Sequence, residues 1–206
     1  MHSSSFTDLL VILLASILTN NILFSKFLGM CSFIALSKSM KTSFGMGTSV
    51  TIVTLCTAVI NYWIYYGVLV ANTSIFGVDL TYLSFLIFVM VIAGFVQLVE
   101  MVLERFSPVL YYNMGIYLPL ITVNCVILGV MLTMIDPNLK FGLKETAMYS
   151  LGSGAGYWLA ICLMAAIRQR LEHADIPKPL VGLGLSLIIT GIMAMAFMGF
   201  SGIVNL

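Results

Sequence analysis

Two cysteines stand beside helix-weakening residues, inside long apolar stretches of this 206-residue chain. Cys31 lies two residues after a glycine in FLGMCSF, and Cys125 directly follows an asparagine in LITVNCVILG, 94 residues later. A disulfide between them would give the protein little mechanism. Thiolates also bind iron, and iron–sulfur clusters in most cases need four of them. Two cysteines are half of such a site, which suggests that a second chain supplies the other half.

The remaining cysteines have a different context. Cys56 lies in a Val/Thr-rich stretch and Cys162 in a Leu/Ala-rich one, and neither has a helix breaker beside it. A free cysteine in such sequence is commonly a small buried hydrophobic residue. We therefore interpret these two as packing residues.

The amino-acid composition indicates the environment in which these cysteines lie. Hydrophobic residues make up 61% of the chain and charged residues only 8%, whereas soluble domains carry about 25% charged residues. Mean hydropathy is +1.10, as expected of an integral membrane protein. No basic tract suggests nucleic acid binding, and the first apolar stretch lacks the features of a cleavable signal.

Six apolar stretches between the charges are long enough to cross a bilayer, since a spanning helix needs about 20 apolar residues. Alternating polar and apolar residues, the pattern of a membrane barrel, are absent. The sequence thus predicts an all-α membrane protein, a single integral domain over residues 1–206, with six transmembrane helices. The predicted spans are Leu9–Leu36, Phe44–Ala71, Leu80–Leu103, Met114–Ile135, Ala147–Ile167 and Leu180–Val204.

Lysine and arginine predict the orientation. The first, third and fifth loops carry six of these residues and the opposite side carries two: Lys38, Lys41, Arg105, Arg168, Arg170 and Lys178 against Lys140 and Lys144. Because cytoplasmic loops are enriched in basic residues, the odd loops are predicted to be cytoplasmic. Both termini then lie on the outer, periplasmic side.

A repeated motif predicts internal symmetry. SFGMG at 43–47 begins the second span and SLGSG at 150–154 begins the fifth, 107 residues later. Chance recurrence of a glycine-rich helix start is the alternative, but the cysteines in corresponding spans argue against it. Two halves of three spans, approximately 6–105 and 110–206, would be inverted relative to each other. Inverted repeats place functional sites near the midplane, at discontinuous helices.

The first and fourth spans carry helix breakers at their centres. The first is 28 residues long, about 42 Å as a helix, against a hydrocarbon core of about 30 Å. Its centre holds Asn20, Asn21, Ser25, Lys26 and Gly29. In the fourth span Pro119 removes a backbone donor, and Asn124 precedes the cysteine. Broken backbone at this depth must be satisfied by protein or water, so we expect both cysteines at helix breaks facing the protein interior.

Three segments carry a resemblance to a known family: NNILFSKFLGMCSFIALSK, LYYNMGIYLPLITVNCVILG and ADIPKPLVGLGLSLIITGIMAMAFMGFSG. They resemble two homologous kinds of membrane protein. One is the E-type component of Na+-translocating NADH:quinone oxidoreductases, and the other is the A-type component of RNF complexes, the ferredoxin:NAD oxidoreductases. GVDLTYLSFLIF, LPLITVNC and GSGAGYWLAI are more similar to the quinone reductase branch. FMGFSG is more similar to the RNF branch.

The resemblance implies a cofactor and partners. Each such protein pairs with a homologous membrane protein of opposite topology, D-type in the quinone reductase and E-type in RNF. Each contributes two cysteines to one intramembrane 2Fe-2S cluster, and the family's ligands fall on Cys31 and Cys125. Electrons would pass from a cytoplasmic flavin and iron–sulfur subunit to a flavin subunit outside, in the inner membrane of a bacterium. The chain alone would hold no complete catalytic site. Sodium or proton coupling stays open.

Neighbouring residues could tune such a cluster, because hydrogen bonds to the sulfurs and nearby charge set its potential. Around the cysteines these candidates are Gly29, Met30, Ser32, Thr122 and Asn124. Lys26 either offsets the negative charge or reaches an interface with its ammonium group. Glu100 and Glu104 share a helix face, and we interpret them as a solvated pair near the membrane surface.

A secondary transporter or channel is the alternative of another class, because an inverted repeat alone would fit it. Such a protein should place ionisable or unwound polar groups at the midplane and has no need of paired thiols. Lys26 is the only ionisable residue at the centre of a predicted span. This favours the electron-transfer function.

Overall fold

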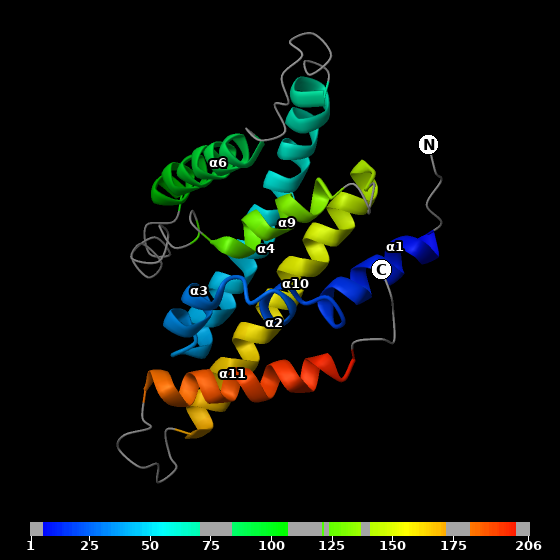
Figure 1. Ribbon diagram of the computed structural model, residues 1–206. Helices are drawn as coiled ribbons and strands as arrows, with labels where there is room; N and C mark the ends of the chain where they lie inside the picture. The colour runs from blue at the N-terminus through cyan, green and yellow to red at the C-terminus, as the bar shows by residue number, and fades with distance from the viewer. Residues whose placement is uncertain are drawn as a thin grey trace.

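The computed structural model describes residues 6–70, 84–106, 121, 124–136, 141–171 and 182–200. These residues form helices and their connections, and they contain no strand. The elements (Figure 1) are α1 (Phe6–Ile17), α2 (Ile22–Ser25), α3 (Met30–Leu36), α4 (Met40–Ile64), the π-helical η1 (Tyr65–Val70), α6 (Ser84–Phe106), α9 (Cys125–Met134), α10 (Leu143–Leu171) and α11 (Leu183–Met198).

Three helices of the described chain are long and apolar enough to cross a membrane: Met40–Gly67, Ser84–Val102 and Leu143–Leu171. Shorter apolar helices occur at Phe6–Ile17, Cys125–Met134 and Leu183–Met198. The all-helical, apolar character predicted from the sequence is thus confirmed. The six crossings and their inversion stay a prediction.

Helices α4 and α10 lie side by side through the middle of the molecule (Figure 1). A Cβ on Gly47 would overlap the ring of Trp158, and a Cβ on Gly154 would lie 2.8 Å from the Thr51 Cα. Small residues of this kind let helix backbones approach closely. The two contacts are reciprocal, because Gly47 and Thr51 lie 107 residues before Gly154 and Trp158, the spacing of the repeated motif.

A second glycine face of α10 receives α1. A Cβ on Gly152 would lie 2.9 Å from the carbonyl oxygen of Leu13, and one on Gly156 would lie 3.2 Å from that of Ile17. Residues four apart share one face of a helix, so Gly152 and Gly156 face α1 while Gly154 faces α4. The glycines of the fifth span therefore bring two helices against α10.

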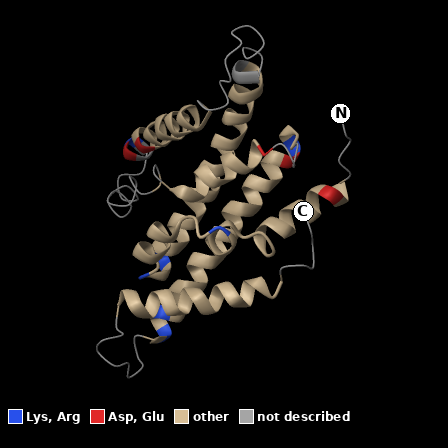
Figure 2. Cartoon of the chain, in the orientation of Figure 1, with Lys and Arg blue, Asp and Glu red and all other residues tan. Residues whose placement is uncertain are grey.

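Basic residues gather at the end of the molecule where α3, α4 and α11 meet (Figure 2). There Arg168 of α10 donates to the carbonyl oxygen of Ile34, at 3.0 Å, and to the hydroxyl of Ser186. Lys38 and Lys41 lie at the start of α4, just beyond the helix that contains Ile34. The basic residues at the start of α4 and at the end of α10 thus share one end of the molecule, and Arg168 also joins three helices.

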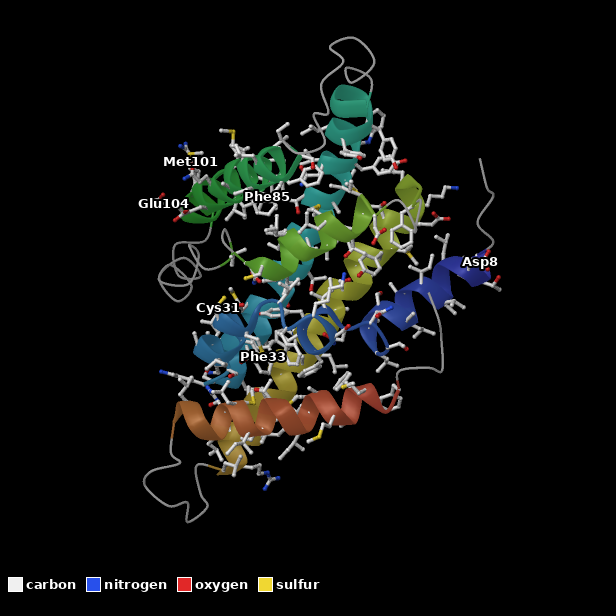
Figure 3. The ribbon with its side chains drawn as sticks, in the orientation of Figure 1. Asp8, Cys31, Phe33, Phe85, Met101 and Glu104 are labelled. Atoms are coloured by element: carbon white, nitrogen blue, oxygen red, sulfur yellow. The ribbon has the colours of Figure 1, made fainter. Side chains whose placement is uncertain are left out.

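Helix α6 leaves most of its apolar surface uncovered by the rest of the described chain. Phe85 is 50% exposed and Met101 60% exposed, and Figure 3 labels both on this helix. A face of this kind suits lipid or another protein, as expected of a membrane protein. Glu100 and Glu104 lie on the last turns of this helix.

Candidate functional site

The first predicted span is interrupted, as its excess length indicated. Helix α1 ends at Ile17, and the single turn α2 begins after Asn21, whose φ of −62° and ψ of 113° are extended. The Asn21 Oδ1 accepts from the backbone N–H of Leu23 at 3.1 Å. Its Nδ2 donates to the carbonyl oxygens of Ile17 at 3.1 Å and Gly156 at 3.0 Å. One asparagine thus joins both sides of the break to α10.

A second break separates α2 from α3. Phe27 has a φ of 55° and Gly29 a φ of 88°, both in the left-handed region that L side chains disfavour. A Cβ on Gly29 would overlap the Cγ2 of Val126 in α9. The carbonyl oxygen of Gly29 accepts from the Ser32 hydroxyl and the Phe33 backbone N–H, each at 3.0 Å. Glycine is therefore required here by its backbone angle and by the close approach of α9.

The second cysteine is the first residue of α9. Asn124 precedes it as the N-cap, with a φ of −74° and a ψ of 117°, and its Oδ1 accepts from the backbone N–H of Val126 at 3.1 Å. An N-cap of this type satisfies one of the free N–H groups of a helix start. Pro119 and Thr122 lie outside the described residues, so the parts predicted for them stay predictions.

The structure brings the two predicted ligands together. The thiols of Cys31 and Cys125 are close enough to interact electrostatically, and the backbone N–H groups of Cys31 and Ser32 lie near the Cys31 sulfur. The contact between Gly29 and Val126 holds the starts of α3 and α9 against each other. Residues far apart in sequence thus form one local group of two sulfurs.

The prediction that both cysteines face the protein interior is wrong for Cys31. Cys31 is exposed and Cys125 is partly exposed. Figure 3 shows Cys31 at the outer edge of α3 and Phe33 on its inner side. The reason is the rotation of α3: Ser32 and Phe33 are fully buried, so the preceding residue points outward. The pair of sulfurs is therefore open at the surface of this chain, where a second chain could reach it.

Tyr157 of α10 belongs to this group, although it was not predicted from the sequence. Its hydroxyl donates to the Ser32 hydroxyl at 2.9 Å, and its side chain is 1% exposed. The phenol also interacts with Asn124 and with both cysteines. The sequence offers one clue, since Tyr157 directly follows Gly156 in the segment GSGAGYWLAI, but aromatic residues in apolar helices are common.

The amide of Asn124 carries an unused donor. The residue is 2% exposed, and its Nδ2 makes no hydrogen bond of normal geometry within the described part of the chain, although the Tyr157 hydroxyl lies near it. A buried donor without an acceptor costs about 1–3 kcal/mol, so the site suits a group that brings an acceptor. The sulfur atoms of an iron–sulfur cluster are acceptors of this kind. Two thiols, nearby N–H groups and a free buried donor fit such a cluster.

The other candidates lie apart from this group. Lys26 donates to the Thr133 hydroxyl at 3.0 Å, and Thr133 lies eight residues beyond Cys125, about 12 Å along a helix. The ammonium group therefore does not lie beside the sulfurs. Cys56 in α4 and Cys162 in α10 are partly exposed and lie inside continuous helices. Met30, the first residue of α3, packs against the core.

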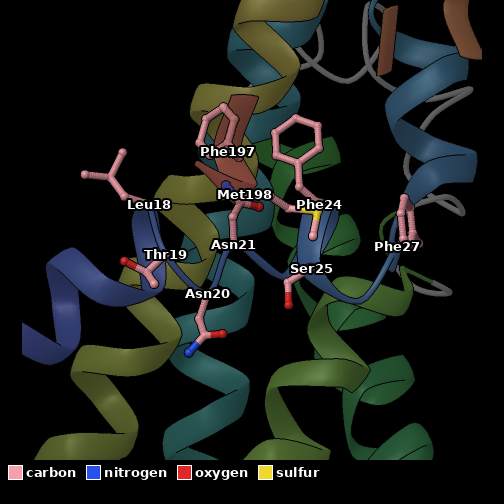
Figure 4. A pocket seen from close by; sticks show the side chains of 9 residues that line it. All are labelled: Leu18, Thr19, Asn20, Asn21, Phe24, Ser25, Phe27, Phe197 and Met198. Atoms are coloured by element: carbon pink, nitrogen blue, oxygen red, sulfur yellow. The ribbon is translucent and has the colours of Figure 1, made fainter. Parts of the chain in front are cut away.

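A cavity of about 220 Å³ lies beside the first break. Figure 4 shows the rings of Phe24 and Phe197 on one side of it and the polar side chains of Asn20 and Ser25 on the other. Neither Cys31 nor its partner thiol lines this cavity. It is a feature of the contact between the α1–α2 connection and α11, separate from the cysteine group.

Comparison with known proteins gives two findings. The profile of a family described as "Rnf-Nqr subunit, membrane protein" matches residues 9–204. Over 188 residues, the chain is 45% identical to the E-type subunit of the Na(+)-translocating NADH-quinone reductase of Proteus mirabilis (strain HI4320). That alignment covers 91% of this chain and 94% of the relative.

Proposed function

The chain belongs to the Rnf-Nqr family of membrane subunits, and on this premise we propose that it is the E-type subunit of a Na+-translocating NADH:quinone oxidoreductase. Its thiolates would bind a 2Fe-2S cluster shared with a homologous D-type subunit. Electrons would cross the inner membrane of a bacterium on this cluster, between the flavin subunits of the complex. The name of the relative supports the quinone reductase over the RNF complex, whose A-type component is the alternative.

One observation carries the proposal: Cys31 and Cys125 come together from two separate helix starts. A cysteine that only fills space has no need of a helix break or of a second thiol. The breaks cost stability, since each leaves backbone groups without helical partners. Their presence around two sulfurs is explained if the sulfurs bind something that the rest of the chain does not supply.

The residues around the sulfurs have defined tasks in this proposal. A 2Fe-2S cluster, when bound, takes up and releases one electron at a time. The N–H groups of Cys31 and Ser32 stabilise negative charge on the Cys31 sulfur. The free Nδ2 of Asn124 would donate to a sulfur atom. Exposure of Cys31 leaves room for the two cysteines that the partner must contribute.

The predicted inverted repeat is part of the same proposal. The reciprocal contacts of Gly47 with Trp158 and of Gly154 with Thr51 support it, because a two-fold axis makes each contact occur twice. Asn21 and Asn124, which begin α2 and α9, support it as well. We infer two three-helix halves with six crossings and both termini on the periplasmic side.

The four cysteines provide the test. We expect Cys31→Ser and Cys125→Ser to abolish the membrane cluster and quinone reduction, because a serine oxygen is a harder ligand than a thiolate. Cys56→Ser and Cys162→Ser are the matched controls and should retain iron. Iron content and electron paramagnetic resonance (EPR) spectra of the four assembled complexes decide the matter. Equal iron loss in Cys56→Ser would show the ligand assignment to be wrong.

A further inference from the structure

We propose that Tyr157 is a positioning residue that sets the reduction potential of the cluster. It would act through Ser32, the residue that follows the first ligand. This inference rests on the proposed function, because it concerns a cluster held by Cys31 and Cys125. It goes beyond that function by assigning a role to a residue that binds no iron.

The hydroxyl of Tyr157 begins a chain of buried hydrogen bonds. It donates to the Ser32 hydroxyl at 2.9 Å, and that hydroxyl donates to the carbonyl oxygen of Gly29 at 3.0 Å. Tyr157 is 1% exposed and Ser32 is fully buried. Water therefore has no access to compete for these bonds, so the tyrosine fixes the first turn of α3.

Tyr157 also reaches the second break. Its ring atom Cε2 lies 3.5 Å from the position of a Cβ on Gly29, and its hydroxyl interacts with Asn124 and with both thiols. One side chain thus contacts the starts of α3 and α9. Its own place is fixed, because the carbonyl oxygen of Gly156, the preceding residue, accepts the bond from Asn21.

The contact of Tyr157 with Ser32 affects the reduction potential of the cluster. Hydrogen-bond donors near the sulfurs stabilise the reduced cluster, which is the more negative state, and so raise the potential. The backbone N–H of Ser32 lies near the Cys31 sulfur. By fixing Ser32, the tyrosine hydroxyl holds this donor toward the sulfur, and its own O–H bond points toward the same residue. Without the hydroxyl, the potential should fall.

The experiment is a redox titration of the assembled complex carrying Tyr157→Phe, followed by EPR. The ring is kept, so packing is kept. We expect unchanged iron content, altered g-values and a midpoint potential shifted to more negative values. Ser32→Ala should shift the potential in the same direction, and the double variant should add little, since both changes interrupt the same bond.

Tyr149→Phe is the matched control. Tyr149 lies on the same helix, is 5% exposed and interacts with Thr133 and Ser153, away from the sulfurs. It should leave the potential unchanged. An unchanged or more positive potential in Tyr157→Phe would overturn the inference, as would an equal shift in Tyr149→Phe or loss of iron from Tyr157→Phe. A wild-type complex without a cluster on these cysteines would instead refute the proposed function, and the inference with it.

Discussion

Asn21 and Asn124 begin their helices with nearly the same backbone angles, and each is 2% exposed, yet their amide nitrogens have opposite surroundings. The Nδ2 of Asn21 donates to Ile17 and Gly156. The Nδ2 of Asn124 has no hydrogen-bond partner in the described chain. The same residue thus closes one break completely and leaves the other with a free donor.

The difference distinguishes a helix break that is only structural, at Asn21, from one that is a candidate binding site, at Asn124. At the first asparagine every polar group of the side chain is satisfied within the chain, so the break is stable by itself. At the second, the free donor lies in a group that includes two thiols, Ser32 and Tyr157. Buried polar groups are rarely left unsatisfied. The described chain has several such atoms, and the one beside two sulfurs supports the proposal that a bound group completes the break at Asn124.

The largest effect is expected where the break between α2 and α3 touches the start of α9. Gly29→Ala would force a side chain into Val126 and into a left-handed backbone, φ 88°. We expect the starts of α3 and α9 to separate and the assembled complex to lose most of its cluster iron. Gly182→Ala is the matched control, because Gly182 also has a positive φ, 112°, but no atom within 4 Å of its added Cβ. Iron analysis of both complexes measures the contrast, and equal retention would contradict the contact.

A matched pair of serine substitutions separates the two asparagines by stability. Serine caps a helix about as well as asparagine does but lacks the amide nitrogen. Asn21→Ser should lower the free energy of unfolding by about 2 kcal/mol, since two hydrogen bonds are lost. Asn124→Ser should not lower it, because the amide nitrogen that it removes is an unsatisfied donor. Unfolding in mixed micelles measures both values, and a larger cost for Asn124→Ser would reverse the comparison.

The same pair separates the asparagines by redox behaviour. Asn124→Ser should shift the midpoint potential of the cluster to more negative values, because a donor to sulfur is lost. Asn21→Ser should leave the potential of the assembled cluster unchanged. A redox titration followed by EPR gives both numbers. A shift in Asn21→Ser alone would mean that the free donor serves another purpose.

The smallest effect is expected at Lys26. Its ammonium group binds Thr133, about two helical turns from Cys125, and it therefore contributes little to the charge around the sulfurs. Lys26→Gln keeps a donor for Thr133 and should leave the potential unchanged. A marked negative shift in the redox titration would show that the lysine acts on the cluster at this distance.

Much of this arrangement is readable from the sequence. The scarcity of charge identifies a membrane protein, and the excess length of the first span predicts its interruption. The spacing of the glycine motifs predicts that α4 and α10 correspond, and their reciprocal contacts agree. The proposal that the paired thiols are cluster ligands rests on the resemblance to a family, since two cysteines in apolar sequence leave several uses open.

The rest depends on tertiary packing that local sequence does not encode. The outward direction of Cys31 follows from the rotation of α3, which Ser32 and Phe33 determine by packing inward. Tyr157 reaches the site through the packing of α10 against the start of α3. Lys26 donates to Thr133, 107 residues away. Neither role predicted for Lys26 from the sequence, offsetting the charge of the cluster or reaching an interface, involves that bond.

The most direct test of the proposed half-site, in which this chain supplies two of four cluster ligands, is iron quantification with EPR, on this chain purified alone and on the chain co-purified with the proposed D-type partner. If each of the two proteins supplies two thiolates, the reduced pair should show the signal of a 2Fe-2S cluster and about two irons per pair. The chain alone should show neither. A complete cluster on the chain alone, or a pair without iron, would contradict the half-site.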